Sequence, residues 1–461
     1  MGNQGRVLAL LTGLYATTLW ATQNATPPAE SLVEKARYLA KEGNICQLTT
    51  PEALKALLGP PRSEEKNLDG DPETLVLRYG DLTARFSRSA DHLTAFLLQT
   101  LTTPPGRLAS LLGRTKGRDI EIGRGDVLRS PADLARCNPM WGVASTSLVG
   151  LDLREHEATL EKMPFDTRTL WPPHDRLPDG FDPVRRLEEG KNPGLGVRGL
   201  HAQGIDGHGV AIAIIDQPLW RNHQEYARQL VRYEAIGVEG IDPQIHGPPV
   251  CSIAVGAQCG VAPRAALYFY AVPPWDWQDN QPWAQQIDKI IELNQTLTDQ
   301  PRIRVVSISS GMFSQWPHFD LWKAAVAKAA QNGILVVTCG NTSTSLAPLR
   351  RDPNGDPNDP ACYRPGRYPH PGALGVPAGN RTTASHHGPD QYTYWVEGAM
   401  SWAVPYMAGL AALAFQVDPE IPPAQIKELW TATATKTPAG PIVNPRQFIE
   451  AVRSRRDKDR P

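Results

Sequence analysis

The chain has few of the features that mark several common classes of protein. Its 461 residues carry 47 basic and 48 acidic side chains, so no net positive charge favours nucleic acid or an anionic membrane as a partner. Its six cysteines form no CxxC pair, which argues against a zinc knuckle. No GxSxG elbow occurs, which argues against a lipase-like α/β-hydrolase. The glycines at 204, 207 and 209 precede a predicted strand instead of following it, unlike those of a dinucleotide-binding loop.

Long apolar runs are also scarce. Residues 1–25 contain one arginine followed by an apolar run from Val7 to Trp20, which is the layout of a secretory signal. The run is short for a membrane span, and neither Ala21 nor Ala25 completes a small-x-small cleavage site. We therefore expect residues 1–25 to be a signal peptide or an uncleaved N-terminal anchor. The protein is then secreted or held at the cell envelope, with no other membrane span.

Export would place the cysteines in an oxidising compartment, where disulfides form. Under that condition we expect Cys46 to pair with Cys137 in the N-terminal part. Further pairing is expected within the later part, although the spacing does not determine which residues are joined; the later cysteines are Cys251, Cys259, Cys339 and Cys362.

Residues 26–180 differ in character from the rest of the chain. Helical periodicity in residues 30–43 and 50–59, and strand-like alternation in residues 74–87 with a turn at Gly80–Asp81, predict a small α+β region. The region contains no catalytic constellation, so it is interpreted either as a prodomain or as a permanently attached domain. Proline and glycine then crowd the sequence, which predicts a linker over 181–200.

Residues 201–440 alternate between two patterns. Short runs rich in Val, Ile and Ala are typical of strands buried on both faces, and amphipathic helical patterns lie between them. This alternation predicts an α/β fold with a doubly wound parallel sheet, whose chemistry collects at the carboxyl ends of the strands. The mixed-charge residues 441–461 are expected to be a solvated tail. The predicted strands lie in residues 210–216, 265–272, 303–310 and 333–339, and the clearest helices in 283–297 and 321–333.

Ser401 precedes a segment, residues 402–415, that is apolar on every side and therefore predicts a buried helix. Because proline is tolerated in a first helical turn, Pro405 favours a helix start within a residue or two of Ser401. A serine at that place is either an ordinary N-cap or a nucleophile at the positive end of the helix dipole.

Three other polar residues lie where this serine would need partners. Asp216 ends a predicted strand, His246 precedes a predicted helix, and Asn341 follows another strand. Each has an ordinary interpretation by itself: a turn-forming aspartate, a structural histidine and a turn asparagine. Together with Ser401 they converge on one edge of the predicted sheet, which is the geometry that a catalytic triad needs.

Residues from about 195 to 435 resemble the catalytic domain of the subtilases, the subtilisin-like serine peptidases. The Asp, His, Ser order along the chain is that of subtilisin. The blocks that carry the resemblance are GHGVAIAIIDQPLW (207–220), HGPPVCSIAVG (246–256), GVAPRAALYFYAV (260–272), VVSISSGM (305–312), GILVVTCGNTS (333–343) and AMSWAVPYMAGLAAL (399–413).

The resemblance implies a subtilisin-like fold and peptide-bond hydrolysis. Asp216 would orient His246, His246 would act as the base for the nucleophile Ser401, and Asn341 would donate to the oxyanion. Main-chain groups of Ser309, Ser310 and Gly311 would bind an extended peptide substrate.

The chain also departs from the family pattern. Pro248 and Pro249 follow His246–Gly247, and Met400 and Trp402 flank Ser401, where the family has other residues. An alternative function is therefore a weak or inactive pseudopeptidase that acts as a binding module. No cofactor is expected and the protein is expected to be a monomer. Residues 352–360, DPNGDPNDP, resemble a Ca²⁺ loop, although its three prolines favour a plain surface turn.

Overall fold

The computed structural model describes residues 51–66, 74–79, 82–89, 92–100, 127–137, 140–273, 277, 279–340, 345–366 and 372–459. The chain divides into two compact units, residues 1–118 and 119–461. The expected boundary near residue 180 does not coincide with this division, because the described part of 127–180 belongs to the second unit. Cys46 and the whole of residues 1–25 lie outside the described residues.

The first unit contains a helix, α3 (Pro51–Leu58), and a four-stranded antiparallel sheet in the order β1-β2-β3-β4. Leu75 and Leu77 alternate along β2 and are both buried, as the period of two of a strand requires. Strands β2 and β3 pair with Thr74 opposite Ser87, as expected for a hairpin there. The strands are β1 (Ser63–Lys66), β2 (Thr74–Arg78), β3 (Leu82–Ser89) and β4 (His92–Thr100).

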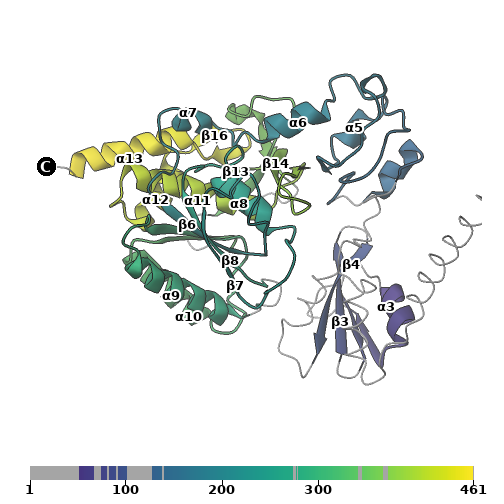
Figure 1. Cartoon of the computed structure of the whole chain (residues 1–461), viewed down its shortest axis with the longest axis horizontal. Helices are drawn as coiled ribbons and strands as arrows, with labels where there is room; N and C mark the ends of the chain where they lie inside the picture. The colour runs from purple at the N-terminus through teal and green to yellow at the C-terminus, as the bar shows by residue number, and fades with distance from the viewer. Residues whose placement is uncertain are drawn as a thin grey trace, which may run out of the picture. The chain divides into compact units, whose positions relative to one another are not determined.

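The second unit is built on a five-stranded parallel sheet in the order β10-β9-β6-β8-β7, seen in Figure 1. Largely apolar runs form β6, β8, β9 and β10 because both faces of the sheet are covered there, whereas the edge strand β7 contains Arg232 and Glu234 and is only partly buried. The strands are β6 (Ala211–Asp216), β7 (Leu230–Ala235), β8 (Ala266–Ala271), β9 (Ile303–Ile308) and β10 (Leu335–Thr338). The covering helices are α8 (Gly247–Val255), α9 (Asn280–Thr296), α10 (Phe319–Gln331) and α11 (Met400–Val417).

Strand β6 shows how the two faces are filled. Ile212 and Ile214 pack in one hydrophobic cluster with residues of α8 and α11, whereas Ala213 and Ile215 pack in a second cluster with residues of α9 and α10. In Figure 1 these helix pairs lie on opposite sides of the sheet. The predicted α/β architecture with a doubly wound parallel sheet is confirmed.

Helix α11 is apolar on every side because it is surrounded by protein. Residues Trp402 to Phe415 are all buried. Within the described residues it is the one helix long and apolar enough to cross a membrane, and 78% of it is buried inside the fold. Its composition therefore reflects a central core position.

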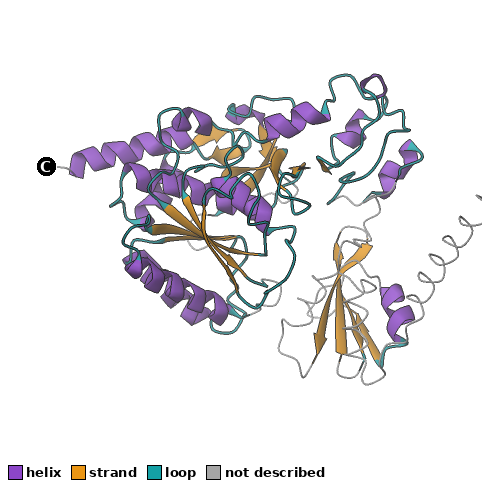
Figure 2. Ribbon diagram, in the orientation of Figure 1, coloured by secondary structure: helices purple, strands orange, loops and turns teal. Residues whose placement is uncertain are grey.

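The second unit contains two further sheets, one of five strands and one of three, drawn among the orange strands of Figure 2. One has the order β12-β11-β13-β17-β16 and the other the order β14-β15-β5. The first contains β11 (Leu346–Arg351), β12 (Tyr363–Pro365), β13 (Leu374–Gly379), β16 (Thr435–Thr437) and β17 (Gly440–Ile442). The second contains β5 (Phe165–Asp166), β14 (Arg381–Ala384) and β15 (Tyr392–Trp395).

The segment expected to be a linker, 181–200, contains two packed helices. Helix α6 (Pro183–Gly190) begins after Asp182, whose side chain accepts a hydrogen bond from the Arg185 N–H, and Pro183 occupies the first turn. These are helix-start signals, so the proline marks a helix here and not a loop. Helix α7 (Val197–His201) comes next. Upstream lie the short elements η2 (Pro131–Arg136), α5 (Glu157–Leu160) and η3 (His174–Arg176), and η4 (Pro360–Cys362) occurs later.

The expected solvated tail is instead a helix, α13 (Pro445–Asp459). Phe448, Ile449 and Val452 are buried on one face in the cluster that contains α11. Arg455 forms an ion pair with Asp418 and bonds Gln425 of α12 (Pro423–Ala432). The charged residues of this segment therefore form the outer face of an amphipathic helix.

Candidate active site

Asp216 and His246 come into direct contact at the carboxyl edge of the sheet. Asp216 is the last residue of β6 and is 3% exposed, and its Oδ1 lies 2.7 Å from Nδ1 of His246. This contact requires Nδ1 to carry the ring proton, which leaves Nε2 of a neutral ring as a hydrogen-bond acceptor. The imidazole is therefore set up to take a proton at Nε2.

The loop after Asp216 supports the pair through main-chain contacts. The Gln217 N–H donates to Asp216 Oδ1 at 2.8 Å, and the Gln217 side chain accepts from the backbone N–H of His246 at 3.2 Å. A Cβ placed on Gly247 would lie 2.1 Å from the Gln217 carbonyl oxygen, so only glycine fits there. The two segments that carry the pair are thus packed backbone against backbone.

The two prolines that depart from the family pattern are accommodated by the helix start. His246 is the N-cap of α8, and Pro248 and Pro249 lie in its first turn. The N–H groups of that turn have no helical acceptor, so prolines remove no helical hydrogen bond there. The unusual sequence after His246 therefore leaves the position of the histidine intact.

Ser401 lies at the start of α11, which begins at Met400 as predicted within a residue or two of this serine. Its hydroxyl donates to the main-chain oxygen of Ser309 at 3.4 Å, and the Ser309 hydroxyl donates to the main-chain oxygen of Ser401 at 2.9 Å. Among the described residues, no hydrogen bond joins Ser401 to His246. The expected nucleophile and base thus occupy neighbouring elements, but the serine hydroxyl is directed to Ser309.

Other contacts place Ser401 in the same neighbourhood as the pair. The ring of Trp402, the next residue, meets the His246 ring with centroids 5.3 Å apart and an interplanar angle of 60°. Burial raises the pKa of the Cys339 thiol to about 12, and among the weaker influences are a contact with Ser401, which lowers it, and the charge of Asp216, which raises it. Cys339 therefore lies near both the serine and the carboxylate.

The segment expected to bind substrate runs beside β10. The Cys339 N–H donates to the Ser310 carbonyl oxygen at 3.1 Å, which continues the parallel pairing of β9 and β10 past Ile308 and Thr338. A Cβ on Gly311 would lie 2.6 Å from the Phe313 ring, and one on Gly340 would lie 2.9 Å from the Met312 nitrogen. Glycine at both positions lets the aromatic ring and the neighbouring backbone approach closely.

Two sequence expectations remain outside these contacts. Asn341, the expected oxyanion donor, lies outside the described residues, so its role stays a prediction. In the possible Ca²⁺ loop, the carboxylates of Asp352, Asp356 and Asp359 each accept an N–H from the residue two positions later. No group of three potential metal-ligating side chains gathers in the part of the chain that the structure describes.

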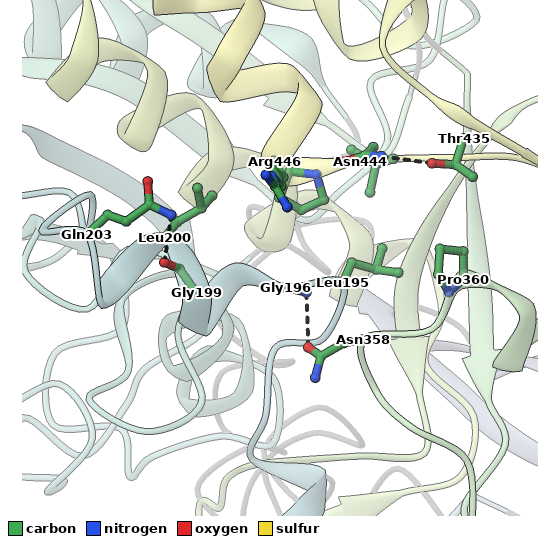
Figure 3. Close-up of a pocket in the computed structure, with 12 residues that line it drawn as sticks. Leu195, Gly196, Gly199, Leu200, Gln203, Asn358, Pro360, Thr435, Asn444 and Arg446 are labelled. Carbon is green, nitrogen blue, oxygen red and sulfur yellow. Dashed lines mark hydrogen bonds between the residues drawn. The ribbon is translucent and has the colours of Figure 1, made fainter.

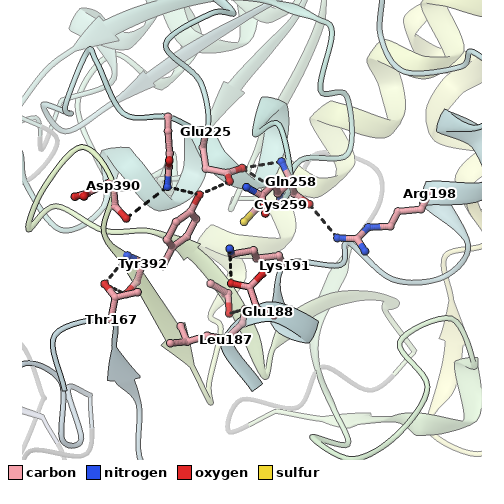
Figure 4. A network of polar contacts seen from close by, with 12 residues as sticks. Thr167, Leu187, Glu188, Lys191, Arg198, Glu225, Gln258, Cys259, Asp390 and Tyr392 are labelled. Atoms are coloured by element: carbon pink, nitrogen blue, oxygen red, sulfur yellow. Dashed lines mark hydrogen bonds and ion pairs between the residues drawn. The ribbon is translucent and has the colours of Figure 1, made fainter. Parts of the chain in front are cut away.

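A buried carboxylate connects three segments of the second unit by hydrogen bonds, as Figure 4 shows. Glu225 is fully buried; one oxygen accepts from the Tyr392 hydroxyl at 2.7 Å, and the other accepts from the N–H groups of Gln258 and Cys259, both at 3.0 Å. The nearby His223 is also buried, and its ring nitrogens lie 3.2 Å from the Glu225 nitrogen and 2.9 Å from the Gln391 oxygen. This network connects the loop after β6, the end of α8 and the β14–β15 hairpin.

A cavity of about 540 Å³ lies elsewhere, near α7 and the start of α13 (Figure 3). Leu200, Asn358 and Arg446 are among its lining residues, and Asn358 accepts a hydrogen bond from the Gly196 N–H at 3.0 Å. None of Asp216, His246 and Ser401 lines it. The chemistry of the polar residues, and not cavity size, therefore identifies the candidate site.

The sequence analysis did not predict that Gln217, Cys339 and Trp402 contact the expected site residues. Gln217 and Trp402 directly follow Asp216 and Ser401, and Cys339 ends the buried strand run before Asn341. Their adjacency to the expected site residues is the signal that could have identified them.

Comparison with known proteins finds a similarity to one family over part of the chain. Residues 207–395 match the model of the subtilase family, a match that ends just before Ser401. The subtilisin-like protease PopC of Myxococcus xanthus is 36% identical over 89 residues, which cover 17% of this chain and 19% of that protein. The chain thus matches about a fifth of the length of this curated relative.

Two solved structures illustrate the structural likeness. The subtilase cytotoxin SubAB structure has a TM-score of 0.46 at 15% identity and covers 57% of this chain and 96% of its own. Fervidolysin from Fervidobacterium pennivorans has a TM-score of 0.43 at 17% identity. The match covers 57% of this chain and 47% of the fervidolysin chain. The family match coincides with the strands and helices that carry Asp216 and His246. Over residues 207–395, the chain is thus similar to the subtilase family.

Proposed function

We propose that the chain is a serine endopeptidase in which Asp216, His246 and Ser401 form the catalytic triad. The observation that carries the proposal is the 2.7 Å contact between Asp216 and His246 Nδ1, because it leaves Nε2 as the free base. The similarity of residues 207–395 to the subtilase family supports a serine peptidase in general, and the assignment of individual residues is our own.

In the proposed reaction, His246 Nε2 removes the proton of the Ser401 hydroxyl while Oγ attacks the peptide carbonyl carbon. The negative charge moves to the carbonyl oxygen, where the Asn341 amide and the Ser401 N–H stabilise it. The C–N bond then breaks as the imidazolium returns its proton to the leaving amine. Water hydrolyses the acyl-serine by the same sequence, with His246 again accepting and returning a proton. Asp216 stabilises the imidazolium throughout.

The serine must turn before it reacts. In the structure its hydroxyl bonds the Ser309 oxygen, an acceptor that an extended peptide N–H would compete for. Catalytic hydrogen bonds that are long or absent in a free enzyme commonly tighten when substrate binds. We therefore assign the observed orientation to the resting state.

The test is covalent labelling with a fluorophosphonate. The wild-type protein is expected to become labelled at Ser401, and Ser401→Ala is expected to abolish labelling. Ser454→Ala is the matched control, since this serine is exposed on α13 and bonds only within its own helix. An unlabelled wild-type protein, processed or not, would overturn the peptidase proposal.

The orientation of Ser401 gives a specific reason to retain the alternative of a pseudopeptidase that binds peptides without cutting them. This function predicts an unlabelled but folded protein that retains a peptide on the segment Ser309–Gly311. Isothermal calorimetry measures peptide binding to the wild type and to Ser401→Ala. A pseudopeptidase is expected to bind the peptide, whereas an inactive preparation is not.

We further propose that the protein is exported and that the N-terminal region is removed by its own activity. The apolar run from Val7 to Trp20 supports export. N-terminal sequencing of the protein recovered outside the cell, from wild type and from Ser401→Ala, gives the mature end. A mature end that is the same in both would refute self-processing, and retention in the cytoplasm would refute export.

A further inference from the structure

The start of α11 carries a local defect in its hydrogen bonding. Pro405 lies inside the helix. In an α-helix the N–H of residue 405 would donate to the carbonyl oxygen of residue 401, and proline has no N–H. The carbonyl oxygen of Ser401 therefore lacks its regular helical donor, and a strong acceptor of this kind is costly to leave unpaired even where it is only partly buried.

A side chain from the neighbouring strand occupies this position. Ser309 directly follows β9, and its hydroxyl donates to the Ser401 carbonyl oxygen at 2.9 Å. The donor comes from a strand that pairs with β6, the strand that ends at Asp216. The hydrogen bond thus connects the start of α11 with the sheet that carries the carboxylate.

We infer that the Ser309 hydroxyl is a positioning group that replaces the amide missing at Pro405 and fixes the main chain of Ser401. This inference rests on the proposed function, because it matters for catalysis only if Ser401 is the nucleophile. Fixing the main chain of Ser401 places both its Oγ and its N–H, which are the reacting atom and an oxyanion donor. Substrate would still bind the main chain of residue 309, so the side chain acts on turnover and not on affinity.

A double-mutant cycle between Ser309 and Pro405 tests the replacement directly. Ser309→Ala removes the donor, and Pro405→Ala supplies the N–H that makes this donor redundant. We expect Ser309→Ala alone to lower the fluorophosphonate labelling rate constant about tenfold, since a partly buried acceptor is left unpaired. In the Pro405→Ala background the same change is expected to have an effect of less than about twofold. Equal losses in both backgrounds would overturn the inference.

Two further variants separate positioning from general damage. Ser309→Thr keeps a hydroxyl and is expected to retain the labelling rate. Ser307→Ala is the matched control, because this neighbouring hydroxyl is buried and has no partner among the described residues. With a peptide ester substrate, Ser309→Ala is expected to lower kcat at unchanged KM. A raised KM at unchanged kcat would assign the hydroxyl to substrate binding instead.

The cycle also remains informative if the protein proves not to be a peptidase. In that case the wild type is unlabelled, and the same four proteins are compared by their urea unfolding midpoints. A lower midpoint for Ser309→Ala that disappears in the Pro405→Ala background supports the replacement. Additive shifts would refute it independently of any activity.

Discussion

The indole ring of Trp402 meets the imidazole ring of His246 edge to face, with the ring centroids 5.3 Å apart. Trp402 is 7% exposed, and its Nε1 has no hydrogen-bond partner among the described residues. Trp402, which follows the proposed nucleophile Ser401, therefore also packs against the ring of the proposed base His246.

Replacing Trp402 tests the importance of this ring contact. Trp402→Ala leaves a cavity and is expected to lower the free energy of unfolding by about 3–5 kcal/mol. Trp402→Phe keeps an aromatic edge and removes an unpaired N–H, so we expect its stability to stay within about 1 kcal/mol of wild type. Chemical denaturation measures both, and equal losses for the two variants would show that the ring contact is unimportant.

Asp216→Asn tests the orienting role of the carboxylate. The amide is nearly isosteric, but its NH₂ group can donate to Nδ1 and so favour the wrong tautomer of His246. We expect kcat to fall about 10⁴-fold with the fold intact. Peptide hydrolysis and circular dichroism are the measurements, and a loss of less than about tenfold would contradict the assigned role of Asp216.

The buried Glu225 predicts a large effect on stability. Glu225→Ala leaves the Tyr392 hydroxyl and two N–H groups without their acceptor, so the free energy of unfolding is expected to fall by about 3 kcal/mol or more. Glu450→Gln is a suitable control, because its pair with Arg446 is exposed and is expected to contribute less than about 1 kcal/mol. Thermal and urea unfolding measure the free energy of unfolding of both variants, and equal losses would contradict a structural role for Glu225.

His223 predicts a dependence of stability on pH. Burial lowers its pKa below the ordinary value of 6.5. Below about pH 6.5 the unfolded chain therefore binds a proton that the folded chain does not, so stability falls as the pH drops until the folded-state pKa is passed. His201, whose pKa burial also lowers, adds to the same slope. His223→Gln is expected to flatten the decline of the urea midpoint between about pH 7 and 5, and an unchanged slope would exclude His223 as its source.

The cysteines predict slow alkylation of the native protein. The five described cysteines are unpaired, and burial raises the pKa of Cys251 and Cys259 well above the usual value. Thiolates, not thiols, react with iodoacetamide, so these two are expected to stay unmodified at about pH 8 until the protein unfolds. Mass spectrometry after alkylation without reductant measures this. A disulfide between any of the described cysteines, which the sequence suggests, would contradict the structure.

The sequence was most informative where residues are buried on both sides. The continuous apolar run before Asp216 predicted a central parallel strand, and the apolar helix predicted after His246 placed this histidine at the same edge of the sheet. Both predictions depend on burial, which leaves a clear mark on composition.

Two helices and one side-chain orientation were not predicted from the sequence. The helix that begins at Pro183 was mistaken for a linker, because the surrounding prolines and glycines outweighed the N-cap Asp182. The helix that begins at Pro445 was mistaken for a tail, because charges on its outer face obscured the buried Phe448 and Val452. The orientation of the Ser401 hydroxyl has no counterpart in the sequence pattern, since a side-chain torsion responds to local acceptors and not to periodicity.

Gly247 has a consequence for how the chain tolerates change. With no room for even a methyl group against the Gln217 oxygen, the separation of the carboxylate from the imidazole is determined by peptide groups meeting peptide groups. Substitutions at the surrounding side chains can then change the environment of Asp216 and His246 while the two side chains keep their spacing. The side chains around this pair are thus free to change in evolution without altering the contact between Asp216 and His246.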